Sequence, residues 1–188
     1  TVLSCKTETA MVEPSPSVSG STEDLMPLAT GLQVSSVLHR DHDQFGKQHL
    51  LDGSVETCWN SDQGTPQLIQ IHFDEDAPVD IDGLQIMFQG GFVGKDCTVL
   101  GSQDGTTFPV DLHRPFFPQD NNTLQSFPLS SSLSRIQKLR IVFGGSTDFY
   151  GRVTIYQLQV LGRVSSEGGA PWTKQHEEKE TAEKGSCS

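Results

Sequence analysis

Short stretches of the chain alternate between apolar and polar residues with a period of two. Ile69, Ile71 and Phe73 occupy every second position of one stretch, and the same pattern recurs at 84–88 and 139–143. Successive side chains of a β-strand point to opposite faces, so this period is typical of strands with one buried face. Each of the three stretches is therefore predicted to be a strand that covers a core.

The last apolar stretch, at 148–162, changes parity halfway along. Its apolar positions move from Val153 and Ile155 to Leu158 and Val160. One inserted residue has this effect, because two residues then oppose a single residue of the neighbouring strand. The shift predicts either a β-bulge or a strand buried on both faces.

Turn residues separate these stretches. Residues 99–102 are predicted to form a strand that ends at the Gln-Asp-Gly turn 103–105, followed by a return strand that opens on Phe108. A short strand is predicted at 124–129, after the Asp-Asn-Asn turn 120–122. These signals favour consecutive antiparallel strands.

The middle of the chain shows no long helical period. The polar run 39–50 is predicted to be a loop or one helical turn. Many short strands with Gly and Asp turns are typical of an all-β protein, and we expect a jelly-roll β-sandwich over residues 32–164.

The two ends lack an apolar period and differ in composition from the middle. Residues 1–31 are rich in Ser, Thr, Pro and Glu, and residues 165–188 mix a Gly-rich linker with Glu and Lys. Such segments bury too little apolar surface to offset their ordering entropy, so both are predicted to be flexible. Trp172 is the aromatic residue of the second segment, and it would dock on the domain, dock on a partner, or stay exposed.

The charge of the chain excludes some classes of partner. Asp and Glu number 24 against 13 Lys and Arg, which leaves a net charge of -11. Neutralisation of phosphates by Lys and Arg supplies most non-specific nucleic-acid affinity, so direct DNA or RNA binding is disfavoured. Anionic membrane surfaces are disfavoured for the same reason, and no apolar stretch has the length of a membrane span.

The four cysteines indicate a reducing compartment. Cys5 and Cys187 lie in the two ends, and no Cys-x-x-Cys pair occurs. No secretory signal segment opens the chain, so we expect a protein that is not secreted, with Cys58 and Cys97 acting as small hydrophobic residues.

Catalytic motifs are missing from the sequence. It contains no Gly-x-Ser-x-Gly elbow, no phosphate-binding Gly-rich loop and no zinc spacing around His39, His42 and His49. The acidic run 74–76 lacks the later Gly and Glu of an EF-hand, and it is predicted to be a solvated turn. We therefore expect a protein that is not an enzyme.

The stretch 51–62 organises the middle of the chain. It places an Asp-Gly turn at 52–53 ahead of Trp59, which we expect to be a core residue. Its pattern Leu-x-Asp-Gly-x-x-x-Thr-x-Trp resembles the first signature of the discoidin, or coagulation-factor type C, family of galactose-binding-like jelly rolls. The Ser-x-Asp-Gly run that starts at Ser102, with the aromatic Phe108 after it, resembles a second signature.

Other loop residues resemble one small intracellular kind of member of this family. They are the stretches 34–38, 44–47, 56–64, 88–92, 120–122 and 147–156. This resemblance implies a repressor-type regulator of transcription that binds an orphan nuclear receptor in nucleus and cytoplasm. The chain has no Leu-x-x-Leu-Leu receptor box, so a receptor contact would use the folded surface.

Family members often hold a calcium ion near the first signature. The resemblance implies that Asp52 and Thr57 would offer oxygens to such a structural calcium ion. The closing strand, however, has Gln157 where metal-binding relatives are expected to carry an acidic ligand. Asp52 is therefore either a turn cap or a calcium ligand, and no other cofactor is expected.

A partner is expected to bind the loops, because the strands are committed to the core. The candidate partner-binding residues are Phe92 and Val93, in a Gly-rich turn, and Phe116 and Phe117. Phe92 is alternatively a plug that closes the end of the sandwich. The competing function is that of a structural or adaptor subunit in a larger assembly, such as the ciliary transport machinery.

Overall fold

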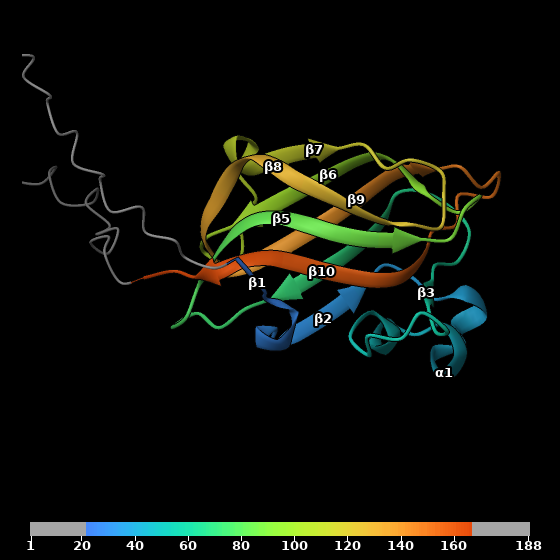
Figure 1. Ribbon diagram of the computed structural model, residues 1–188, viewed down its shortest axis with the longest axis horizontal. Coiled ribbons are helices and arrows are strands. Elements are labelled where there is room, and N and C mark those ends of the chain that lie inside the picture. The colour runs from blue at the N-terminus through green and yellow to red at the C-terminus, as the bar shows by residue number, and fades with distance from the viewer. Residues whose placement is uncertain (1–21, 167–188) are drawn as a thin grey trace, which may run out of the picture.

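The computed structural model describes residues 22–166, and two antiparallel β-sheets make up most of this part of the chain (Figure 1). The strands are β1 (Glu23–Asp24), β2 (Gly31–Val34), β3 (Trp59–Asn60), β4 (Gln67–His72), β5 (Val79–Phe88), β6 (Gly94–Ser102), β7 (His113–Phe116), β8 (Leu124–Ile136), β9 (Lys138–Ser146) and β10 (Thr154–Val164). The helical turns are η1 (Met26–Leu28), η2 (Leu38–Arg40), α1 (His42–Phe45), η3 (Lys47–Leu50) and η4 (Val110–Leu112).

The two sheets face each other as a sandwich. Sheet A has the order β1-β10-β5-β8, with β3 also paired to β10, and sheet B has the order β2-β4-β9-β6-β7. Neighbours in the sheets are often far apart in the sequence, as a jelly roll requires. The predicted all-β sandwich is confirmed.

The core lies between the inward faces of the two sheets. Ile69 and Ile71 of β4 are fully buried, and so are Leu139 and Ile141 of β9, which lies beside it. The stretch 84–88 of β5 buries its alternate residues from the opposite sheet. The three strands predicted from alternation are therefore confirmed, together with their buried faces.

Strand β10 contains the irregularity that its parity shift predicted. Its register against β5 shifts between Ile155 and Gln157, so that Ile155 and Leu158 both point inward. The extra residue forms a β-bulge. The bulge keeps the apolar side chains before and after it in the core.

Trp59 is fully buried, as expected. Its indole N–H donates a hydrogen bond to the carbonyl of Ser36, at 3.0 Å. A buried indole N–H needs such a partner, because an unpaired donor in the core is costly. Trp59 thereby joins the stretch after β2 to strand β3.

The sandwich begins earlier than predicted. Leu25 and Met26 are 1% and 5% exposed within the core, and the Leu25 N–H donates to the carbonyl of Val160 at 2.7 Å. The prediction that residues 1–31 are a flexible segment is therefore wrong for 22–31. Two apolar residues in a polar context carry no period, and only the pairing of β1 with β10 buries them.

Two strand boundaries also differ from the prediction. The return strand after turn 103–105 does not open on Phe108, because η4 intervenes and β7 begins at His113. Strand β8 continues through a Ser-rich stretch to Ile136, well past the predicted end at Leu129. It lies at the edge of sheet A with one face toward water, so its polar residues do not end it.

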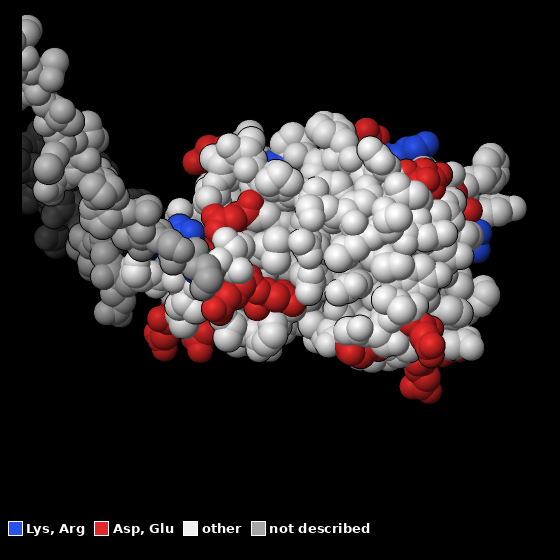
Figure 2. All heavy atoms as spheres, in the orientation of Figure 1, with Lys and Arg blue, Asp and Glu red and all other residues white. Residues whose placement is uncertain are grey.

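The outer face of sheet A carries few charges at its centre. Its register aligns Gln159, Gln85 and Ser126 in one row across three strands. Figure 2 shows this face as a broad uncharged area over β5, β8 and β10, with acidic side chains gathered along its edges.

Candidate functional site

The structure separates the four residues that were predicted to bind a partner. Phe117 is 79% exposed and Phe92 is half-buried, whereas Val93 and Phe116 are 1% and 5% exposed in the core. Placing Val93 and Phe116 on a partner surface is therefore wrong. Phe116 ends β7 facing inward, and its ring centroid lies 5.0 Å from that of Phe127. The alternation of the strand then turns Phe117 toward water.

Two loops meet at one end of the sandwich, the turn 89–93 after β5 and the loop 147–153 before β10. The Thr147 N–H donates to the carbonyl of Val93 at 2.8 Å, and the Thr147 hydroxyl oxygen accepts from the Val93 N–H at 2.9 Å. This reciprocal pair holds the two loops together, and Val93 anchors them in the core.

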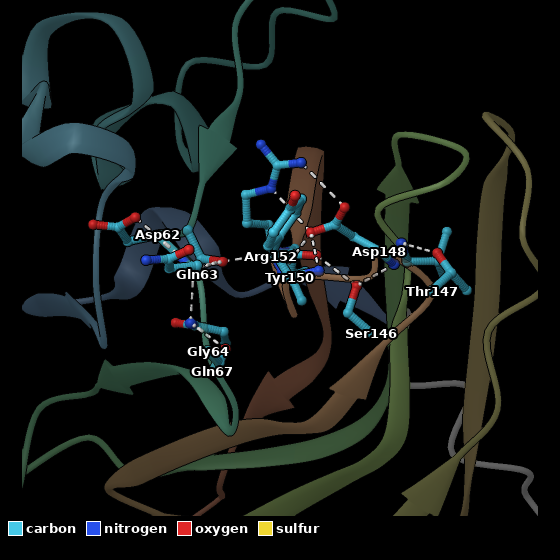
Figure 3. A network of polar contacts seen from close by, with 12 residues as sticks. Asp62, Gln63, Gly64, Gln67, Ser146, Thr147, Asp148, Tyr150 and Arg152 are labelled. Atoms are coloured by element: carbon cyan, nitrogen blue, oxygen red, sulfur yellow. Dashed lines mark hydrogen bonds and ion pairs between the residues drawn. The ribbon is translucent and has the colours of Figure 1, made fainter.

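Asp148 closes the second loop onto itself (Figure 3). Its Oδ2 accepts hydrogen bonds from the backbone N–H groups of Tyr150 and Arg152, at 3.2 and 3.1 Å, and from Arg152 Nε at 2.9 Å. A fourth bond joins Arg152 Nη2 to Asp148 Oδ1 at 3.1 Å. The Arg152 side chain accordingly lowers the pKa of Asp148 and keeps that carboxyl charged.

A third loop supports the second from beside it. The Gly64 N–H donates to the carbonyl of Tyr150 at 2.8 Å, and Gln67 Nε2 donates to the carbonyl of Gly64 at 2.7 Å (Figure 3). Gly151 has a φ of +80°, and a Cβ there would come within 3.1 Å of the Gly64 backbone. Glycine is therefore required at 151 by both conformation and space.

Phe149 and Tyr150, called here the aromatic tip, project from this braced loop. Phe149 is 93% exposed and Tyr150 is 59% exposed, and their rings meet edge to face with centroids 5.3 Å apart. The guanidinium of Arg152 lies 5.5 Å from the Tyr150 centroid and 5.0 Å from that of Phe92. Phe92 and Tyr150 therefore lie near the same guanidinium.

The aromatic tip did not emerge from the sequence patterns. The pattern at 148–162 predicts one final apolar element, whereas β10 begins only at Thr154. The available signal was the turn from Asp148 to Gly151, because Asp and Gly favour turns and connecting segments run over the surface.

Asp52 and Thr57 come together as predicted, but in a hydrogen bond with each other. Asp52 Oδ2 accepts from the Thr57 hydroxyl at 2.6 Å and faces His49 Nδ1 at 3.1 Å, while Oδ1 accepts from the Ser54 N–H at 2.9 Å. Burial raises the pKa of Asp52, but these hydrogen bonds outweigh it, and the net shift is downward.

A calcium ion at Asp52 and Thr57 stays a prediction. Calcium takes six to eight oxygen ligands, and here both oxygens of Asp52 accept hydrogen bonds from its own turn. Within residues 22–166, no group of three or more His, Cys, Asp or Glu side chains is placed to hold a metal. Asp52 fits the alternative role, that of a turn cap for residues 52–57.

A hollow of about 300 Å³ lies between β2 and η3. Lys47 is the ionisable residue of its lining, and its ammonium donates to the carbonyl of Leu32 at 2.6 Å. The hollow therefore does not bring an acid and a base together for catalysis.

The two cysteines of the sandwich are free thiols. Burial raises the pKa of Cys58, and burial together with Asp96 raises the pKa of Cys97 to about 12. Thiolate is the reactive form of cysteine, so Cys97 acts as a small hydrophobic residue. Cys5, Cys187 and Trp172 lie outside the described residues. No helix within 22–166 has the length and apolar character needed to cross a membrane.

Curated relatives match the chain over most of their own length. All bear the name nuclear receptor 2C2-associated protein. The Danio rerio protein is 46% identical over 140 residues, which cover 74% of this chain and 96% of the relative. The Homo sapiens protein is 46% identical over 143 residues, with 75% and 97% covered, and the Xenopus laevis protein is 48% identical over 131 residues, with 69% and 91% covered.

Solved structures share the fold at low sequence identity. A chitosan-binding module from Paenibacillus sp. IK-5 superposes with a TM-score of 0.58 at 17% identity, covering 74% of this chain and 99% of the module. The family 32 carbohydrate-binding module of Clostridium perfringens NanJ, solved with galactose, gives 0.58 at 15% identity, with 75% and 99% covered. An F5/8 type C domain from Bacteroides fragilis gives 0.57 at 14% identity, with 71% and 91% covered.

The resemblance to coagulation-factor type C domains is thus confirmed for the fold. No family model matches the chain. Its identity to the curated relatives, over nearly their whole length, is what assigns it. The chain belongs to the family of nuclear receptor 2C2-associated proteins, built on a discoidin-type, galactose-binding-like β-sandwich.

Proposed function

We propose that this chain is a non-enzymatic interaction module that associates with a nuclear receptor in nucleus and cytoplasm and acts as a repressor-type regulator of transcription. The shared name of the relatives supports a nuclear receptor as partner.

The exposure of Phe149 carries this proposal. Its side chain is 93% exposed, although burying a Phe side chain is favourable by about 1.5–3 kcal/mol. An exposed aromatic side chain on a fixed loop is a suitable anchor for a partner, because a few aromatic residues supply most of the energy of an interface.

The bracing of the loop makes the anchor more effective. Asp148 closes the loop onto itself, and Thr147 and Gly64 tie it to the two neighbouring loops. A loop that is ordered before binding loses less conformational entropy in the complex, so more of the contact energy appears as affinity.

Capture of nuclear receptor 2C2 by the purified full-length chain tests the proposal. Phe149→Ala removes the ring and none of the braces, so we expect about tenfold or greater loss of receptor affinity at an unchanged melting temperature. Phe117→Ala is the matched control, because Phe117 is also highly exposed, at 79%, but follows β7. A loss with Phe117→Ala alone would move the contact to that residue.

Capture experiments with the same purified chain also distinguish the proposed function from the competing one. A structural subunit of ciliary transport machinery would be recovered with ciliary rather than nuclear proteins. Recovery of the receptor from nuclear extract, sensitive to Phe149→Ala, supports the proposal. Failure of the wild-type chain to bind purified receptor would refute it.

A further inference from the structure

The outer face of sheet B gathers basic side chains in a protein with a large excess of acidic ones. His72 of β4 is paired in register with Lys138 of β9, and Gln70 is paired with Arg140. Their chain neighbours Ile71 and Leu139 are fully buried. By alternation, His72, Lys138 and Arg140 therefore share the face that points away from the core.

Neutral groups hold Arg140 in one orientation. Its guanidinium lies 4.1 Å from the centroid of the Phe108 ring, and its Nε and Nη2 donate to Gln70 Oε1 at 3.1 and 2.7 Å. Gln70 Nε2 in turn donates to Gln33 Oε1 at 3.3 Å and lies 3.1 Å from His72 Nε2. The amide of Gln70 is thus oriented from both ends, and it fixes the arginine fork.

Arg140 and Lys138 have no acidic partner in the part of the chain described here. The ion pairs among these residues join Arg152 to Asp148 and Arg163 to Asp80 and Asp82, besides His49 to Asp52.

The two cations still have donors to offer. Arg140 uses two of its five N–H donors, and Lys138 uses one of its three on the carbonyl of Gly105. Burial lowers the pKa of His72, and the charge of Lys138 lowers it further.

We propose that this face binds an extended, acidic segment of a partner protein, with one carboxylate on Arg140 and a second on Lys138. Positions 138 and 140 are separated by about 7 Å along the strand, the repeat of two residues in an extended chain. Acidic residues at alternate positions of such a segment have the same spacing and share one face. The segment therefore carries Asp or Glu two positions apart.

Charge and geometry both favour carboxylates as the ligand. A fixed guanidinium fork matches a carboxylate through two parallel hydrogen bonds. The chain carries a net charge of -11, and acidic side chains lie along the edges of the sheet A face (Figure 2). These charges repel an acidic segment, which favours its binding to the basic face of sheet B. This surface is separate from the aromatic tip and does not depend on it.

Nuclear magnetic resonance titration of the isotope-labelled full-length chain tests the proposal. One synthetic peptide repeats Glu-Ser-Glu-Ser-Ser twice, and a second repeats Glu-Glu-Ser-Ser-Ser twice, with the same composition but no acids two positions apart. We expect the first peptide to shift the amide signals of Gln70, His72, Lys138 and Arg140 saturably, and to bind several-fold more tightly than the second.

Matched variants locate the contact. Arg140→Gln is expected to lower the affinity for the first peptide about tenfold. Arg140→Lys keeps the charge but not the planar guanidinium, so it is expected to lower the affinity by a smaller factor. Arg163→Gln is the control, because Arg163 already pairs with Asp80 and Asp82. We expect the Arg163→Gln variant to bind the first peptide with the affinity of the wild type. If Arg140→Gln does not fold, Lys138→Gln on the same face replaces it.

Several results would overturn the proposal. These are the absence of saturable shifts on this face, unchanged binding by a folded Arg140→Gln or Lys138→Gln variant, an equal loss with Arg163→Gln, and saturation by inorganic phosphate at the same concentrations. Phe149→Ala is expected to bind the peptide normally, so a failure at this face and a failure at the aromatic tip are distinguishable.

Discussion

At the scale of single residues, aspartates close the turns of this protein. Asp104 accepts bonds from the N–H groups of Thr106 and Thr107, at 2.8 and 2.7 Å, and Asp148 plays the same part in the loop before β10. A carboxylate that accepts backbone N–H groups satisfies donors which the turn would otherwise leave to water. Some of the acidic residues of the chain therefore have a structural role as turn caps.

Trp59 provides the residue-scale prediction. Trp59→Ala is expected to lower the free energy of unfolding by about 3–5 kcal/mol, because it leaves a cavity and frees the carbonyl of Ser36. Chemical denaturation monitored by circular dichroism measures the loss. Trp59→Phe fills most of the space and should lose less, whereas an unchanged Trp59→Ala variant would place the indole outside the core.

At the scale of elements, the edge of sheet A depends on the segment before β2. Strand β1 is only two residues long, but Asp24 Oδ1 accepts from the Met26 N–H at 3.0 Å and sets the direction of η1. Leu25 and Met26 then enter the core together. The burial of these two side chains, more than the short backbone pairing of β1 with β10, thus holds β1 at the edge of the sheet.

A pair of leucines tests this element. Leu25→Ala is expected to cost about 2–5 kcal/mol, as for other buried leucines, while Leu28→Ala, at a position 48% exposed, should cost well under that. Thermal melting of the two variants gives the comparison. Equal melting temperatures would show that residues 22–31 do not belong to the sandwich.

At the scale of the whole molecule, the capping carboxylates couple stability to pH. Hydrogen bonds from Thr107 and Thr106 lower the pKa of Asp104 from its ordinary value of 3.8, and Arg152 lowers that of Asp148. A depressed carboxyl pKa contributes stability that is present above the unfolded value and is lost as the pH falls through the folded value. The loss therefore begins near the ordinary value of 3.8 and grows below it.

Melting temperatures between neutral pH and about pH 2 check this coupling. Asp104→Asn cannot titrate, so its melting temperature is expected to fall less steeply in acid than that of the wild type. Asp74→Asn is the control, because Asp74 accepts the Asp76 N–H at 3.0 Å, whereas Asp104 accepts two backbone N–H groups and the hydroxyls of Ser102 and Thr107. The acid limb of Asp74→Asn is expected to follow that of the wild type. Parallel acid limbs for Asp104→Asn and the wild type would contradict the role given to Asp104.

Much of the fold and little of the candidate site could be predicted from the sequence. The faces of β4, β5 and β9 follow from alternation, and the bulge in β10 follows from its parity, since burial acts on each strand locally. The turn at 103–105 follows from its Asp and Gly residues. The exposure of Phe149 could not be predicted, because it depends on how the folded protein positions the loop 147–153. A local pattern of apolar residues does not contain that information.

The sequence by itself determined the all-β class, the buried faces of the main strands and the core position of Trp59, because these rest on periods of two and on local turn chemistry. Only the tertiary structure decided that Leu25 is core and Phe149 is surface, and that Gln70 holds Arg140 over Phe108. These outcomes depend on contacts between residues far apart in the chain, such as the pairing of β1 with β10 and of β4 with β9. A jelly roll places distant strands side by side, so its surfaces are assembled only when the sheets close.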